Sequence, residues 1–273
     1  MMGWLRALGS RPAGRRRDLA DTLWSDTLAH YPFLSATDSA DLLRLRQLSL
    51  QFLACKEFHG ASGLTISDEM AVAIAAQACL PVLHLQAPYR GIAWYDDFVG
   101  IVVHPGQVKA SRQNMDDDGV VHCYDEVLSG EAMQDGPVTL SWQDVADAGR
   151  SAADGYNVVI HEFVHKIDMR DGAADGCPPL PAGFMGAPTS SAARRRWHDT
   201  LHSHYLAFCD QWSMAERFGA TAPWLDAYGT SSIDEFFAVA SEAYFVNRPR
   251  FANDYAPLLR LMDAFFRPHQ PED

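Results

Sequence analysis

The sequence predicts an α+β fold that is mainly helical, with a small mixed β-sheet. Three observations support this class. Apolar residues recur at helical spacing over the first 80 residues and again after residue 157. Short runs of β-branched and aromatic residues, bounded by turn residues, lie between these two regions. The composition, with 48% hydrophobic and 21% charged residues in a chain of 273, is that of a globular protein with a core of useful size.

Residues 1–18 are expected to form a flexible basic arm. Most of its positive charge follows the short apolar stretch at 4–8, whereas a secretion signal carries its charge ahead of a longer apolar run. The arginines are Arg6, Arg11, Arg15, Arg16 and Arg17. We expect residues 19–268 to form one domain, in which the N-terminal helices (19–80) pack on a catalytic part (81–268).

The first part of this domain reads as helices. The pattern is helical from Leu19 to about Gly60, with leucines at helical spacing as far as Leu53, and Pro32 separates two helices. Thr37 or Asp38 is expected to cap the second helix. Ser67 opens a further helix that ends at Pro81.

The middle of the chain reads as strands and loops. Strands are predicted at 82–85, 92–94, 98–103 and 138–142, and we expect the last to lie at the edge of the sheet, where an extended peptide could add to it. His84 is interpreted as a packed histidine rather than a ligand. Residues 107–119 show no periodicity and are predicted to be an exposed loop; at Asp116–Asp118 a solvated charge run is favoured over a calcium site.

Charge and cysteine content narrow the function classes. The formal net charge of −13 argues against direct binding of nucleic acid or of an anionic membrane. No stretch approaches the roughly 18 apolar residues that would span a membrane. Five scattered cysteines without a C-x-x-C pair suggest neither a disulfide framework nor a cysteine zinc site, and a reducing cytoplasm fits best.

An H-E-x-x-H motif lies inside the apolar run from Asn157 to Asp168. On a helix, His161 and His165 lie about 40° apart around the axis and about 6 Å apart along it, so both imidazoles can reach one Zn²⁺ ion. Glu162 is rotated about 60° from His165, which suits a general base acting on a water molecule. Unpaired histidines on a mostly buried helix would be costly, so the context favours a metal site.

A zinc site built on two histidines needs a third protein ligand, and the segment Asp226–Glu242 supplies a candidate. Ser231 or Ser232 is predicted to cap a helix whose first turn holds Glu235, the expected ligand. Glu242 lies two turns further on nearly the same face, and either it or Asp168 could accept a hydrogen bond from a liganding imidazole.

A second histidine pair, His198 and His202, lies on a helix predicted from about Ser191 to Phe218, with His204 nearby. No carboxylate base lies between the pair at the right angle, and arginines are its neighbours. We therefore do not expect a ligand site there.

Several of these motifs, in this order, resemble the Mlc titration factor A family of bacterial zinc peptidases. They are the string from Asn157 to Asp168 with its following Asp-Gly loop, "AAQACLP" at 75–81 and "DEFFAVASE" at 234–242. The resemblance covers roughly Phe33 to Phe266. "YGTSSIDEFF" is also similar to the metallopeptidase lobe of anthrax lethal factor. Nothing is carried over to the arginine-rich N-terminus or the loop at 116–118.

The resemblance implies a zincin-like (gluzincin) metallopeptidase domain with one Zn²⁺ held by His161, His165 and Glu235. It further implies Glu162 as the base and Tyr228 near the scissile carbonyl, where a phenol can donate a hydrogen bond to the developing oxyanion. The activity implied is that of a cytosolic peptidase, notably of aminopeptidase type, acting on peptide substrates. The family also implies binding to the glucose-responsive repressor Mlc.

Two functions of different class therefore stand. One is an active zinc peptidase. The other is a regulatory protein that sequesters a transcriptional repressor of the Mlc type, with vestigial catalysis. Both can hold at once.

Overall fold

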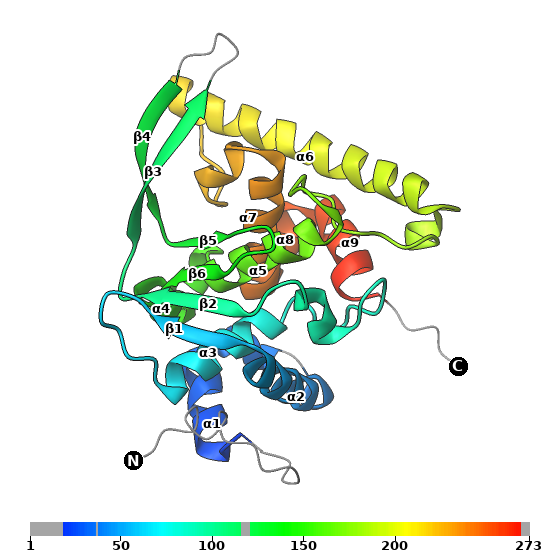
Figure 1. The fold of residues 1–273 in the computed structure, drawn as a ribbon. Helices are drawn as coiled ribbons and strands as arrows, with labels where there is room; N and C mark the ends of the chain where they lie inside the picture. The colour runs from blue at the N-terminus through cyan, green and yellow to red at the C-terminus, as the bar shows by residue number, and fades with distance from the viewer. Residues whose placement is uncertain (1–18, 37, 116–120, 269–273) are drawn as a thin grey trace.

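The computed structural model describes residues 19–36, 38–115 and 121–268, and helices form most of these ranges (Figure 1). The α-helices are α1 (Asp21–His30), α2 (Ser39–Cys55), α3 (Asp68–Cys79), α4 (Trp142–Ser151), α5 (Val158–Asp168), α6 (Ser190–Phe218), α7 (Ile233–Val246), α8 (Arg248–Asp254) and α9 (Ala256–Phe266). The strands are β1 (Glu57–Gly60), β2 (Gly100–His104), β3 (Val108–Met115), β4 (Val121–Leu128), β5 (Gly130–Ala132) and β6 (Val138–Ser141). The predicted class, mainly helical with a small mixed sheet, is confirmed.

Three expectations fall on residues that the structure does not describe. The arm at 1–18, Thr37 as the alternative cap and the acidic run at Asp116–Asp118 all lie outside the described residues. Within the described ranges, no helix is both long enough and apolar enough to cross a membrane.

The N-terminal helices begin where capping chemistry predicts. Asp38 precedes α2 and its carboxylate accepts the Asp41 backbone N–H at 2.8 Å. Ser67 does the same for α3, with its hydroxyl accepting the Met70 N–H at 3.3 Å. These side chains satisfy backbone donors that a helix start leaves unpaired.

The four-stranded sheet has the order β1-β2-β6-β5, with β1, β2 and β6 parallel and β5 antiparallel to β6. The prediction that residues 138–142 form the edge is wrong, because the chain folds back before β6 and adds β5 outside it. A tight turn makes this possible: Met133 N–H donates to Pro137 O and Gly136 N–H donates to Met133 O. Strand β5, rather than β6, is therefore the edge strand on the side of the sheet where the candidate site lies.

Four further expectations about strands are wrong. Residues 57–60, expected to belong to the helical region, form β1, which pairs with β2. Residues 82–85 form turns, and 92–94 belong to a 3-10 helix, η3 (Gly91–Tyr95). Their apolar side chains are mostly buried in the core, so hydrophobicity there reflects burial rather than an extended backbone. Residues 108–115, expected to be a loop, pair antiparallel with β4. The two strands pair through backbone hydrogen bonds. The polar residue types of this segment therefore give no indication of a strand in the sequence.

Helix α5 lies at the centre of the fold, between the sheet and α7 (Figure 1). Phe163 packs the face of α5 that points away from the histidines into the core. The centroid of its ring lies 5.5 Å from that of Phe52, 5.0 Å from that of Tyr95 and 5.9 Å from that of Phe98. Aromatic pairs at these separations add to the stabilisation that burial provides. One face of α5 is thus packed against aromatic side chains, and the opposite face carries the candidate site.

Candidate metal centre

Two imidazoles of α5 point the same way. Asn157 caps the helix, with its side-chain oxygen accepting the Ile160 N–H at 2.9 Å. The Nε2 atoms of His161 and His165 lie 3.2 Å apart, and each histidine is only 8% exposed. The i, i+4 spacing has produced the shared face expected from the sequence.

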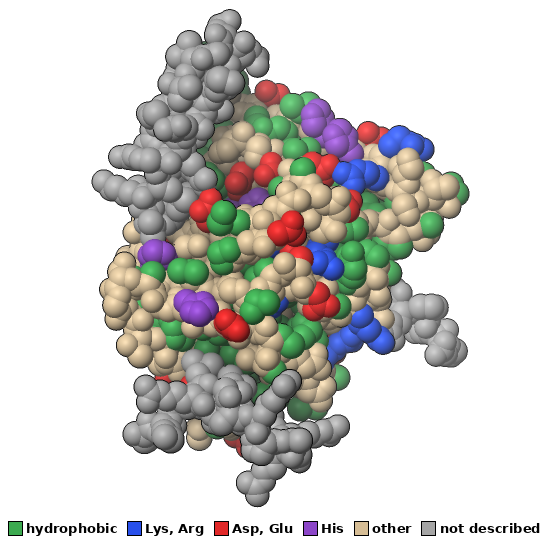
Figure 2. All heavy atoms as spheres, in the orientation of Figure 1, with side chains coloured by type: hydrophobic (Ala, Val, Ile, Leu, Met, Phe, Trp, Pro, Cys, Tyr) green, Lys and Arg blue, Asp and Glu red, His purple; other side chains and the backbone are tan. Residues whose placement is uncertain are grey.

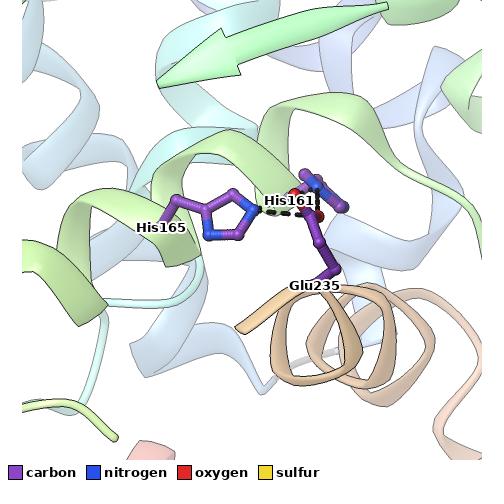
Figure 3. Close-up of side chains that lie close together, drawn as sticks. All are labelled: His161, His165 and Glu235. Atoms are coloured by element: carbon purple, nitrogen blue, oxygen red, sulfur yellow. Dashed lines mark hydrogen bonds and ion pairs between the residues drawn. The ribbon is translucent and has the colours of Figure 1, made fainter. Parts of the chain in front are cut away.

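Glu235 reaches this pair from the first turn of α7 (Figure 3). Its Oε2 atom lies 2.9 Å from Nε2 of His161 and 3.2 Å from Nε2 of His165. Four ligands placed tetrahedrally at about 2.0–2.1 Å from a zinc ion are about 3.3 Å from one another. The two imidazoles and the carboxylate are therefore spaced as three ligands of one zinc-sized ion would be. Among the described residues this is the one group of that kind.

The carboxylate of Glu235 is held in its charged form. Burial by itself favours the neutral acid, but hydrogen bonds from the two histidines hold the pKa of Glu235 below its ordinary value. An ionised carboxylate is the form that binds a cation. The helix cap predicted before it is only partly right: α7 follows Ser232, but that side chain makes no capping hydrogen bond.

Glu242, two turns further along α7, has the contact predicted for it. Its Oε1 atom lies 2.7 Å from Nδ1 of His161, the ring nitrogen that faces away from the site. Such a partner fixes the orientation of a ligating imidazole.

Asp168 does not make the predicted hydrogen bond to an imidazole. Its Oδ2 atom accepts the Gly176 N–H at 2.8 Å, and its Oδ1 atom is buried without a hydrogen-bond partner. The loop after α5 returns over the helix end and brings the Gly176 amide to this carboxylate. Burial raises the pKa of Asp168 to about 7.

Glu162 lies beside the histidines and against strand β5. Burial raises the pKa of Glu162 to about 7, in spite of the neighbouring His161 and His165. A base with a pKa near neutrality is well matched to proton transfer at neutral pH. A Cβ atom added to Gly130 would lie 2.5 Å from Oε1 of Glu162, so a larger residue there would force this side chain or β5 to shift.

The group opens into a cavity of about 560 Å³. Tyr228 lines it, 41% exposed, with its ring 6.0 Å from that of His161. Acidic side chains also line the cavity, and no Lys or Arg is among the described residues that do so. Besides Glu162, Glu235 and Glu242, these are Glu131, Asp144, Asp226 and Asp234. Figure 2 shows acidic side chains gathered around a hollow on this face.

Sequence reasoning missed β5 and Gly130. The only signal in the sequence was the Ser129-Gly130 pair, which indicates a turn and says nothing of its nearness to Glu162. His84 is interpreted from its sequence context as a packed histidine. Its Nε2 atom lies 2.8 Å from Oδ2 of Asp41, a residue of helix α2.

The chain matches the family described as glucose-regulated metallo-peptidase M90 over residues 6–267. It is 34% identical over 251 residues to Mlc titration factor A of Serratia proteamaculans, covering 91% of this chain and 88% of that protein. It is 32% identical over 249 residues to the protein of the same name from Salmonella arizonae, covering 91% of each chain. For the Edwardsiella ictaluri protein the identity is 33% over 249 residues, covering 91% of this chain and 87% of that one.

The family model spans nearly the whole chain, and the relatives match it over most of their own length. The expected relationship to the Mlc titration factor A proteins is therefore confirmed, and the chain belongs to the glucose-regulated metallo-peptidase M90 family.

Proposed function

We propose that this protein is a zinc-dependent peptidase of aminopeptidase type, with one zinc ion per chain and Glu162 as the general base. The observation that carries the proposal is the convergence of His161, His165 and Glu235 beside a buried Glu162 on a cavity wall. A binding protein has no need of a carboxylate in that position.

Zinc bound there would act as a Lewis acid and make water a better nucleophile near neutral pH. Glu162 accepts a proton as the water oxygen bonds to the scissile carbonyl carbon. It then delivers that proton to the amide nitrogen as the C–N bond breaks, which releases a carboxylic acid and an amine, and the acid then passes its own proton to the amine or to solvent. The Tyr228 hydroxyl donates a hydrogen bond to the carbonyl oxygen while negative charge develops on it.

Two features support a peptide as the substrate. Strand β5 is the edge of the sheet beside Glu162, and an extended peptide can add to such an edge through backbone hydrogen bonds. The acidic lining favours a substrate group with positive charge, and every free peptide N-terminus supplies one. This charge is the basis for proposing the aminopeptidase type.

A second candidate function is regulatory. The relatives are named Mlc titration factor A, which favours binding of a transcriptional repressor of the Mlc type. The formal net charge of −13 would complement a basic DNA-binding domain. In the alternative form of this proposal, catalysis is vestigial and sequestration is the function. A cytoplasmic location suits both candidates, and the free thiols of Cys55, Cys79, Cys177 and Cys209 support it.

The variant Glu162→Gln tests both candidates. For a peptidase, the purified variant keeps one zinc ion by metal analysis, while hydrolysis of a fluorogenic aminoacyl panel falls by about 10²–10⁴-fold, the usual contribution of a general base. Asp144→Asn, a second carboxylate that lines the cavity, is the matched control. Full activity in Glu162→Gln with zinc bound would end the peptidase proposal.

The same variant separates catalysis from capture of a repressor. Capture that survives in Glu162→Gln supports a regulatory role independent of turnover. Loss of capture in a folded, zinc-loaded variant would count against that role.

A further inference from the structure

We propose that Gln77 and Asn157 are positioning residues for the His161 imidazole and act on it through Glu242. The inference rests on the proposed function, because it takes His161 to be a metal ligand. It adds a connection between the N-terminal helices and the metal centre that runs through buried hydrogen bonds.

The connection begins on α3. Gln77 is completely buried, and its side-chain Nε2 donates to Ala73 O at 3.1 Å. That contact leaves Oε1 to accept the Asn157 Nδ2–H at 2.8 Å. Both ends of the amide therefore have partners, which fixes its orientation.

Asn157 is the junction. It is also completely buried, and its side chain is used twice: Nδ2 donates to Gln77, and Oδ1 accepts the Ile160 N–H. Its backbone N–H donates to Oε2 of Glu242. One residue thus starts the metal helix, holds α3 and reaches α7.

Glu242 links Asn157 to the His161 imidazole. This carboxylate is 1% exposed, and it has the Asn157 amide on one oxygen and Nδ1 of His161 on the other. Because Nδ1 is engaged by this carboxylate, Nε2 is the nitrogen that would bind a metal ion beside His165 and Glu235. A shift of Asn157 would move Glu242, and with it the ring plane of His161.

Ser49 on α2 is just as buried, but none of its hydrogen bonds among the described residues reaches α5 or α7. Its hydroxyl donates to Leu45 O of its own helix at 2.8 Å, and its other side-chain partner is Cys79 on α3. Gln77 instead joins α3 to α5, and through Asn157 to α7. Removing its amide would leave Nδ2 of Asn157 buried without a partner, a state that proteins avoid at the expense of local geometry.

The test compares Gln77→Met with Ser49→Ala. Zinc affinity is measured by chelator competition on the purified full chain, and the visible spectrum of the cobalt-substituted protein reports ligand geometry. We expect Gln77→Met to weaken zinc binding about tenfold, at the low end of the roughly 10–100-fold range for groups behind a metal ligand. Its cobalt spectrum should change, while Ser49→Ala should leave both measurements as in the wild type.

Asn157→Ser extends the test if Gln77→Met does not fold. Serine keeps the helix cap and the backbone N–H to Glu242, and loses only the donor to Gln77. It should weaken zinc binding by a similar factor, and the double variant should be no worse than either single one.

Wild-type affinity in both Gln77→Met and Asn157→Ser would overturn the inference alone, leaving the proposed peptidase intact. Equal weakening in Ser49→Ala would also overturn it, since the effect would then be general loosening. Absence of zinc binding in the wild type would overturn the inference and the proposed function together.

Discussion

Two histidine pairs with the same i, i+4 spacing lie on different helices of this protein. His161 and His165 on α5 are buried, with their ring planes at 74° and the centroids 4.8 Å apart. His198 and His202 on α6 are exposed, and their rings stack at 13° and 5.2 Å. The spacing places both pairs on one helix face, and in only one of them do the nitrogen atoms converge with a third ligand.

The difference lies in what faces each helix. Helix α7 packs along α5 and brings Glu235 to the open side of the pair and Glu242 to Nδ1 of His161. For the α6 pair, the nearest carboxylate contact among the described residues is that of Asp199, 4.0 Å from His198 and itself exposed. Burial with acceptors from another helix, rather than spacing, therefore distinguishes the candidate metal centre from the exposed pair.

The largest expected effect on zinc binding comes from removing Glu235, the carboxylate that distinguishes the α5 pair from the α6 pair. Glu235→Ala should weaken zinc binding by more than about 100-fold, since even groups behind a ligand contribute about 10–100-fold. Zinc affinity by chelator competition measures this, and Asp234→Ala, one residue earlier, is the control that should bind as the wild type. Unchanged affinity in Glu235→Ala would remove the distinction between the two pairs.

The next effect concerns geometry around the buried pair. Gly130→Ala forces Glu162 or β5 to move, and a displacement of about 1 Å at a reacting group can lower turnover about 100-fold. We expect kcat to fall on that scale while zinc affinity is kept. Gly100→Ala is the control, because its new Cβ would lie 3.4 Å from Pro137 Cβ, an ordinary contact. Wild-type kcat in Gly130→Ala would show that Glu162 does not need this space.

A smaller effect distinguishes the two carboxylates near the pair. Asp168→Ala leaves the buried Gly176 N–H without its acceptor, which should lower the free energy of unfolding by about 1–3 kcal/mol. Urea denaturation of the metal-free protein measures this loss. Zinc affinity should change far less than in Glu242→Ala, and an equal change in both would indicate that Asp168 also serves an imidazole.

The smallest effect is expected at the exposed pair. The double variant His198→Ala, His202→Ala should keep one zinc ion per chain and the same rise in Tm on zinc addition as the wild type, because binding to the α5 pair alone stabilises the native state. Metal analysis and thermal unfolding with and without zinc provide the check. A lost zinc ion would mean that exposed, stacked imidazoles also bind metal.

Much of the local structure was predictable because it depends on neighbours in the sequence. The caps at Asp38 and Ser67, the long α6 and the shared face of His161 and His165 all follow from contacts within four residues. The membership of residues 108–115 in a strand was not predictable in this way. Their partners are 121–128, and the pairing is made by the backbone.

The sequence by itself determined the chemistry of the candidate ligands: two imidazoles one helical turn apart, a carboxylate beside them, and Glu235 as the third candidate. Only the tertiary structure decided that Glu235 arrives across 74 residues of chain at His161, that Glu242 rather than Asp168 meets the imidazole, and that β5 is the edge strand beside Glu162. The physical reason is range. Helix periodicity and capping depend on short-range contacts, whereas convergence on one point depends on how buried faces from distant segments pack together.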